Sequence, residues 1–215
     1  ISGKPVFRWD YGSYFSLPND RLMTYEEAQE FGERVKMREE DAAGIILQNA
    51  HERIGRIAFF TPEYWQGTNS NIIECATPTD TVNAYRCSPI VYSKYCAYSF
   101  WPRSSQYVFG CGALLDSEFC INCYHSVKLR RCVECDSCRD CADSMFCHNC
   151  ENVHDSMFCF NVKNKRYAIG NVEVGREKFL EAKKTLLDWI NKQLEAKGAL
   201  ALDIYNLADF KSKKR

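Results

Sequence analysis

All thirteen cysteines of this 215-residue chain lie between Cys75 and Cys159, and all of them share one phase of a three-residue count. Cysteines scattered at random would share a phase with a probability of about two in a million, so the spacing indicates a repeat. The positions are Cys75, Cys87, Cys96, Cys111, Cys120, Cys123, Cys132, Cys135, Cys138, Cys141, Cys147, Cys150 and Cys159.

The repeat has a period of twelve residues. Most of the cysteines follow one another at intervals of twelve, as in the column Cys75, Cys87, Ser99, Cys111, Cys123, Cys135, Cys147, Cys159. Twelve residues are too few for a helical hairpin repeat, whose period exceeds about thirty, but they suit one coil of a β-solenoid. Four inward positions per coil, three residues apart, predict a narrow tube with four sides. About eight coils at a strand spacing of about 4.8 Å would make a rod roughly 38 Å long.

We expect one side of each coil to be a β-strand with two inward columns. Residues two apart share a strand face, so the column two residues before the main cysteine column should also point inward. At one corner, Asp and Asn residues that tolerate tight turns recur. The second inward column is Ile73, Tyr85, Ala97, Phe109, Ile121, Val133, Met145 and Met157, and the corner residues are Asp80, Asp116, Asp140, Asn152 and Asn164.

Both ends of such a rod need caps, because a solenoid otherwise exposes its terminal coils. We expect an N-terminal cap at 1–71, a Cys-lined solenoid at 72–174 and a C-terminal cap at 175–215. The capping box Thr24-Tyr-Glu-Glu27 predicts a helix to about residue 40, and a second helix should run from 41 to 53, before a short strand at 57–60. An amphipathic helix at 176–197 should fold back over Phe146 and Phe158, ahead of a shorter helix at 199–210.

The overall charge of the chain gives no reason to expect a strongly charged partner. The formal net charge is zero, which gives no global argument for nucleic acid or membrane binding. No apolar run is long enough to span a membrane. The basic tail Lys211-Ser-Lys-Lys-Arg215 could give weak contact with nucleic acid at most. We expect a cytoplasmic or virion-associated protein.

The state of the cysteines is open between thiols, disulfides and metal ligands. Thirteen is odd, so one thiol at least cannot pair within the chain. We favour buried free thiols that pack as small apolar groups, and therefore no cofactor. The alternative is a zinc or iron–sulfur site formed by Cys132, Cys135, Cys138 and Cys141, which would place a thiol at each corner of one coil.

No catalytic set is evident. Cys123 with His125, and Cys147 with His148, are the pairs closest to a nucleophile and its base. The expected geometry places each Cys inside the rod and each His outside it, and no third orienting group is apparent. We therefore expect a protein that is not an enzyme.

Aromatic residues gather in the early coils, and several should point outward. Such a surface is typical of a protein interface, although the N-terminal cap could instead cover it. The candidate partner-binding residues are Tyr92, Tyr95, Tyr98, Phe100, Trp101 and Tyr107.

Two segments carry a resemblance: Cys147-His-Asn-Cys150 and Met157-Phe-Cys-Phe-Asn-Val-Lys-Asn-Lys-Arg-Tyr-Ala-Ile-Gly-Asn171. With the helix that follows, they resemble a group of uncharacterised Cys-rich proteins with Cys-x-x-Cys repeats, found in candidate-phylum bacteria, archaea and tailed phages. The resemblance covers about residues 110–195. It implies a repeat architecture and a metal-linked or virion-associated context, and it transfers no catalytic residue. We expect a structural or interaction protein, a rigid scaffold or assembly component that binds itself or a protein partner. The alternative is a metal-binding module.

Overall fold

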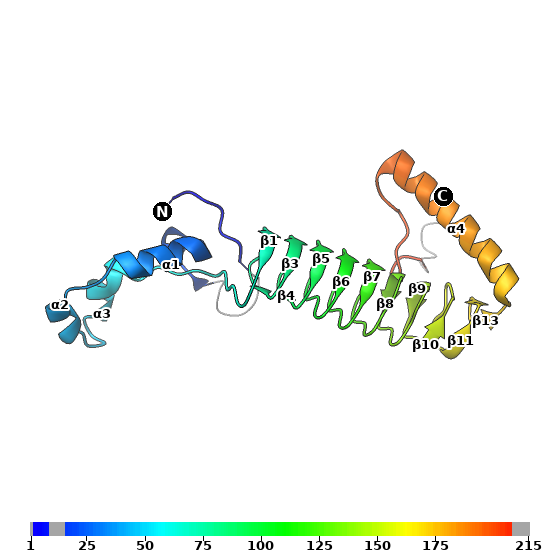
Figure 1. Ribbon diagram of the computed structural model, residues 1–215, viewed down its shortest axis with the longest axis horizontal. Coiled ribbons are helices and arrows are strands. Elements are labelled where there is room, and N and C mark those ends of the chain that lie inside the picture. The colour runs from blue at the N-terminus through cyan, green and yellow to red at the C-terminus, as the bar shows by residue number, and fades with distance from the viewer. Residues whose placement is uncertain (1, 9–15, 208–215) are drawn as a thin grey trace, which may run out of the picture.

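The computed structural model describes residues 2–8 and 16–207. Its central part is a β-solenoid of about eight turns, with short helices at the N-terminal end and one long helix at the C-terminal end (Figure 1). The predicted solenoid of twelve-residue coils with helical ends is confirmed.

Parallel strands stack along the rod with a register of twelve residues. Ser70 pairs with Val82, and Cys135 pairs with Cys147. The main sheet has the order β1-β3-β5-β6-β7-β8-β9, so each strand lies beside the strand one coil away. Its strands are β1 (Ser70–Ile73), β3 (Val82–Tyr85), β5 (Lys94–Ala97), β6 (Gln106–Phe109), β7 (Glu118–Ile121), β8 (Val133–Asp136) and β9 (Met145–His148).

Three smaller pairs complete the described strands. β2 (Pro78–Thr79) pairs in parallel with β4 (Ile90–Val91), and β10 (Glu151–His154) pairs in parallel with β11 (Lys163–Arg166). At the last coil, β12 (Ala168–Ile169) and β13 (Val172–Glu173) form an antiparallel hairpin. This hairpin ends the parallel stack and leads the chain into the C-terminal helix.

The interior consists of the residues in the three-residue phase. Thiols, hydroxyls and small apolar side chains alternate along it, and all thirteen cysteines are buried. Because four side chains share each level of a narrow bore, large residues such as Leu114 and Leu129 are few.

The coil turns differently from the expectation of one Asp/Asn corner. From Asp80 to Tyr167, the residue before each inward position has a left-handed backbone, with Pro89 as the one exception. Bulky residues such as Tyr107 (φ 54°) and Phe146 (φ 53°) adopt this conformation as well as Asp and Asn. Each of the four sides therefore turns at its own left-handed residue.

The prediction of a second inward column was wrong: no residue of this column belongs to the interior cluster, and Met145 and Met157 are buried instead against the C-terminal helix. Ile73, Phe109 and Ile121 are exposed. A left-handed residue stands between this column and the main cysteine column, so the alternation of an ordinary strand is broken and the facing period is three instead of two.

The N-terminal segment contains less helix than expected. α1 (Tyr25–Arg34) begins at the predicted capping box, with both reciprocal hydrogen bonds of Thr24 and Glu27 present, but it ends before residue 40. The second predicted helix divides into α2 (Glu39–Ala43) and α3 (Ala50–Arg53), because the chain leaves the helix at Gly44. Two 3-10 turns, Asn19–Arg21 and Ile54–Arg56, flank these helices. The predicted strand at 57–60 is reduced to one bridge between Leu22 and Phe60.

The C-terminal helix agrees with the prediction. α4 (Arg176–Lys197) ends at Gly198, whose left-handed backbone donates its N–H to Leu194. Phe179 and Ile190 of α4 pack with Met145, Phe146 and Met157 of the rod, and Phe158 packs at the edge of this cluster. The shorter helix predicted at 199–210 is absent between 199 and 207, and its remaining residues, like the basic tail, lie outside the described residues.

Candidate interaction surface

Burial disfavours the thiolate at some of the interior cysteines. All thirteen cysteines are free thiols and all are buried. Burial raises the pKa of Cys96 to about 12 and raises the pKa of Cys123 well above its usual range. The reactive thiolate is therefore disfavoured at both positions.

The four predicted metal ligands do come together. The neighbouring thiols of Cys123, Cys132 and Cys138 lower the pKa of Cys135. The thiols of Cys135 and Cys138 donate to backbone carbonyls, Cys135 to Val133 and Ser144, and Cys138 to Asp136 and Cys147. Within the described ranges, however, no group of three or more His, Cys, Asp or Glu residues has an arrangement that could hold a metal ion. The zinc or iron–sulfur site stays a prediction.

The two Cys–His pairs are separated by the wall of the rod. Cys123 and Cys147 face the interior, whereas the rings of His125 and His148 lie outside. The two rings share one buried carboxylate: Nδ1 of His125 lies 3.3 Å from Asp136 Oδ1, and Nδ1 of His148 lies 2.9 Å from Asp136 Oδ2. This cluster was missed from the sequence, because Asp136 is eleven positions from His125 and twelve from His148, and it meets both rings only through the stacking of neighbouring coils.

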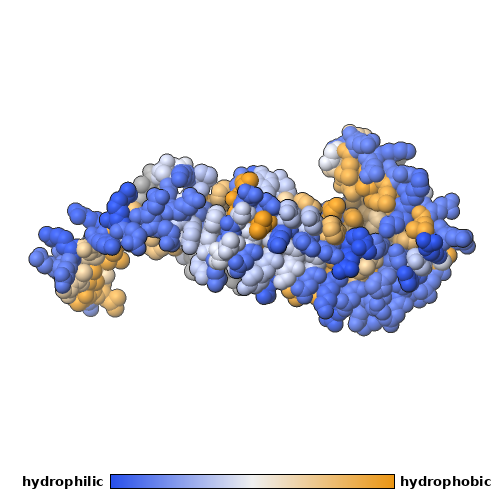
Figure 2. All heavy atoms as spheres, viewed as in Figure 1, coloured by the Kyte–Doolittle hydropathy of each residue, from blue (hydrophilic) through white to orange (hydrophobic). Residues whose placement is uncertain are grey.

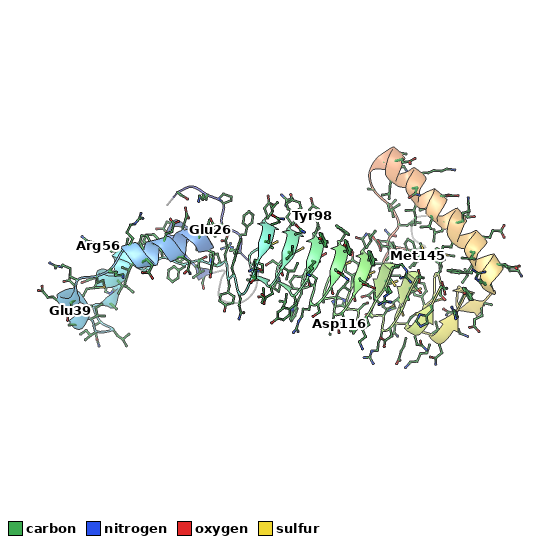
Figure 3. The ribbon with its side chains drawn as sticks, in the orientation of Figure 1. Glu26, Glu39, Arg56, Tyr98, Asp116 and Met145 are labelled. Atoms are coloured by element: carbon green, nitrogen blue, oxygen red, sulfur yellow. The ribbon has the colours of Figure 1, made fainter. Side chains whose placement is uncertain are left out.

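The aromatic residues divide among different sides of the rod. Tyr95 and Tyr107 stack with their ring centroids 4.9 Å apart, and Tyr107 stacks on Phe119 at 4.8 Å, which forms a ladder across β5, β6 and β7. Tyr98 lies on the neighbouring edge, in edge-to-face contact with Tyr85. Figure 3 shows Tyr98 on the upper edge of the rod and Asp116 on the lower edge.

Like Tyr98, three more of the six predicted residues lie away from this ladder. Tyr92 lines a groove of 660 Å³ that runs along the lower edge, where Lys94, Asp116 and Lys128 also contribute. Phe100 and Trp101 contact one another edge-to-face, with centroids 6.3 Å apart, on a further side of the coil. The structure therefore brings two of the six predicted residues together, Tyr95 and Tyr107, and adds Phe119, which the prediction left out.

The outer surface of β1, β5, β6 and β7 exposes large apolar side chains. Phe109 is 44% exposed, and Phe119 and Ile121 are each 48% exposed. We call this surface the sheet face; it consists of Ile73, Tyr95, Tyr107, Phe109, Phe119 and Ile121.

The alternative expectation was that the N-terminal cap covers the exposed aromatic residues. The described part of the N-terminal segment does not cover the sheet face, where Phe109, Phe119 and Ile121 are exposed. In contrast, the same columns are covered at the other end of the rod, where Met145 and Met157 are buried under α4. In Figure 2 the side of α4 that faces the rod is apolar. One apolar strip therefore runs along the sheet, covered by the protein's own helix at one end and open at the other.

The apolar columns that form the sheet face are visible in the sequence, but one of them was expected to point into the interior. Phe109 and Ile121 belong to the column that was expected to point inward. Phe119 belongs to the column of Tyr95 and Tyr107, twelve residues apart, and could have been found by following that column one coil further.

No helix among the described residues is long and apolar enough to cross a membrane. Comparison with models of known protein families and with curated protein sequences gives no match to this chain. The resemblance to the Cys-rich group with Cys-x-x-Cys repeats therefore stays a prediction.

Proposed function

We propose that this protein is a non-enzymatic structural component, a rigid rod that presents the sheet face to a protein partner within a larger assembly such as a virion. The observation that carries the proposal is the open sheet face, beside the covered half of the same strip. Exposed contiguous apolar surface is typical of an interface, and aromatic residues are enriched at interface cores.

The construction of the rod supports a mechanical role. Backbone hydrogen bonds link every coil to the next, and the interior is close-packed with small side chains. Such a stack holds its two ends at a fixed separation, as a spacer requires. Its many free thiols favour a reducing compartment, so we place the protein in the cytoplasm or in a particle assembled there.

The test is sedimentation of the protein in extracts of the cells or particles that contain it. The wild-type chain should sediment with an assembly much larger than the monomer. The variant Phe109→Ser/Phe119→Ser should shift to the free fraction, whereas Leu115→Ser, a similarly exposed residue on another side of the rod, should not. A wild-type chain found only as a free monomer, or a sheet-face variant that still sediments with the assembly, would contradict the proposal.

Metal binding is a second candidate, favoured by one observation. The thiol of Cys135 lies among the thiols of Cys123, Cys132, Cys138 and Cys147, and thiolates are the preferred ligands of zinc and iron–sulfur clusters. Elemental analysis of natively purified protein decides this candidate. Zinc or iron in stoichiometric amount would support it, and a protein without either metal would end it.

A further inference from the structure

The N-terminal helices form an arm that has almost no core of its own. From Thr24 to Phe60, a segment we call the arm, no residue is buried. α2 and α3 contain five and four residues, and helices this short do not persist in water without tertiary packing. Leu47, between them, is 92% exposed. In Figure 2 the lower side of the far end of the arm is apolar, beside hydrophilic residues on its upper side. The arm therefore has an apolar surface that the monomer leaves without a cover.

The arm is held so that it points away from the rod. The N–H of Tyr25 donates to Glu63 Oε2 at 2.8 Å, and the Tyr25 ring stacks on Trp65, whose segment leads into the first coil. Met23 and Phe60 pair through their backbones at 3.0 Å, which ties the two ends of the arm together. Figure 1 shows α1, α2 and α3 beyond the N-terminal end of the solenoid. In this position the arm cannot reach the sheet face of its own chain.

The charges of the arm and of the rod are complementary. Residues 24–60 contain eight Asp/Glu and five Lys/Arg, a net charge of −3. Residues 82–131, which include β3 to β7, contain six Lys/Arg and two Asp/Glu, a net charge of +4. Residues 132–175 contain seven Asp/Glu and four Lys/Arg, a net charge of −3. An acidic partner is therefore attracted to the part of the rod that has the open sheet face and repelled by the part that α4 covers.

Basic side chains are available around the sheet face. Lys94 and Lys128 line the groove that borders the sheet face, and neither has a carboxylate within ion-pair distance among the residues that the structure describes. By contrast, Arg86, Arg130 and Arg131 are already paired, with Glu74, Glu118 and Asp143.

We infer that the arm of one copy binds the sheet face of a second copy. The inference rests on the proposed function and specifies its partner: a second molecule of this chain supplies an acidic, apolar helical segment. The two surfaces differ, so the contact is heterologous, and each copy has one of each. Leu47 and its apolar neighbours would pack on the rings of Tyr107, Phe109 and Phe119, with acidic residues of α1 and α2 near Lys94 and Lys128.

Sedimentation velocity of the purified full chain over a range of concentrations tests the inference. The wild-type protein should gain mass with concentration, and high salt should weaken its association. Leu47→Asp in the arm, or Phe109→Ser/Phe119→Ser in the sheet face, should each weaken association about tenfold or more. The matched controls Gln48→Asp, next to Leu47, and Leu115→Ser, on another side of the rod, should behave as the wild type.

Mixing the variants is the decisive step. A heterologous contact predicts that the arm variant and the sheet-face variant, each monomeric alone, form a dimer when mixed, because each retains the surface that the other has lost. A mixture that stays monomeric, or sheet-face variants that associate with themselves as the wild type does, would overturn the inference.

Exchanging charges between the two surfaces distinguishes a lost contact from an unfolded variant, because an unfolded variant could not regain association. Glu30→Lys/Glu33→Lys changes exposed side chains of α1 and should weaken association with the wild-type rod. Lys94→Glu/Lys128→Glu in the other copy should restore it. A purified protein that is monomeric at every concentration, but sediments with an assembly in extracts, would overturn this inference and leave the proposed function standing.

Discussion

At the residue scale, each inward side chain has to fit the bore and also bond a backbone group of the next coil. The N–H of Ser117 donates to Ser105 Oγ at 3.1 Å, and the N–H of Cys123 donates to Cys111 Sγ at 3.2 Å. Ser105 in turn donates its hydroxyl to the carbonyl of Arg103 at 2.8 Å. Small side chains with an acceptor satisfy both demands, which explains why Cys and Ser fill the interior more often than Ala or Val.

The first prediction concerns one of these internal hydrogen bonds. Ser105→Ala leaves the buried N–H of Ser117 without an acceptor, so the free energy of unfolding should fall by about 1–3 kcal/mol. Ser105→Cys is the matched control, because the same column has Cys at 141, and it should cost much less. Urea denaturation measures both. If both variants lost the same free energy of unfolding, the size of the interior side chain would matter and its hydrogen bond would not.

The inward columns of the rod could be predicted from the sequence, but the backbone conformation of the coil could not. The three-residue phase of the cysteines was sufficient to identify the inward columns and the twelve-residue coil. The left-handed backbone at outward positions could not be predicted, because residues such as Tyr107 and Arg131 disfavour it and the stacked hydrogen bonds of the coil impose it. Asp and Asn at one corner were the only local signal.

At the scale of elements, α4 is the cover of the last coils. Phe179 is fully buried between α4 and the rod, in the cluster with Met145, Phe146 and Met157. The helix could be predicted to the residue from its amphipathic pattern and from Gly198. The lack of a core in the arm could not be predicted. A capping box and an apolar stripe predict a helix, but they do not show whether another part of the same chain packs on it.

A substitution in α4 should loosen the end of the solenoid. Phe179→Ala removes the largest buried ring and should lower the free energy of unfolding by about 3–5 kcal/mol. Amide hydrogen exchange in β9, β10 and β11 should become faster. Leu180→Ala, next to it but 43% exposed, is the control and should change stability by about 0.5 kcal/mol or less. Unchanged exchange in these strands would show that α4 does not cap the rod.

The segment after α4 should respond to pH through Glu134. Its Oε2 accepts the N–H of Ile204 at 3.0 Å, and burial raises the pKa of this carboxyl above its ordinary value of 4.5. A raised folded pKa means that the folded state binds more protons, so the contribution of Glu134 to stability is complete below pH 4.5 and is lost as the pH rises through the folded pKa.

Comparison with Glu134→Gln isolates this contribution. Other carboxyls act in the opposite direction, such as Asp143, whose pKa is lowered by Arg131, but they are common to both proteins. The unfolding free energy of the wild type minus that of the variant should therefore decrease as the pH rises above 4.5. A difference that stays constant or increases with pH would contradict the burial of the Glu134 carboxyl.

At the scale of the whole molecule, the rod is polarised along its length. Its middle is basic and has an exposed apolar surface. Its C-terminal coils are acidic and are covered by α4, and its arm is acidic and lacks a core. Every one of these features depends on a single arrangement, in which coils of twelve residues stack and enclose the sulfur atoms. The sides of the rod could not present distinct surfaces if the columns did not keep their register over about eight turns.

Thiol alkylation followed by intact-mass measurement tests this arrangement most directly. In the folded protein the thirteen cysteines are enclosed, so brief treatment with a polar alkylating reagent should add no label. After unfolding without a reductant, the same reagent should add thirteen labels, because none of the sulfurs is in a disulfide. Rapid labelling of the folded protein, or fewer than thirteen labels after unfolding, would contradict a solenoid lined with buried free thiols.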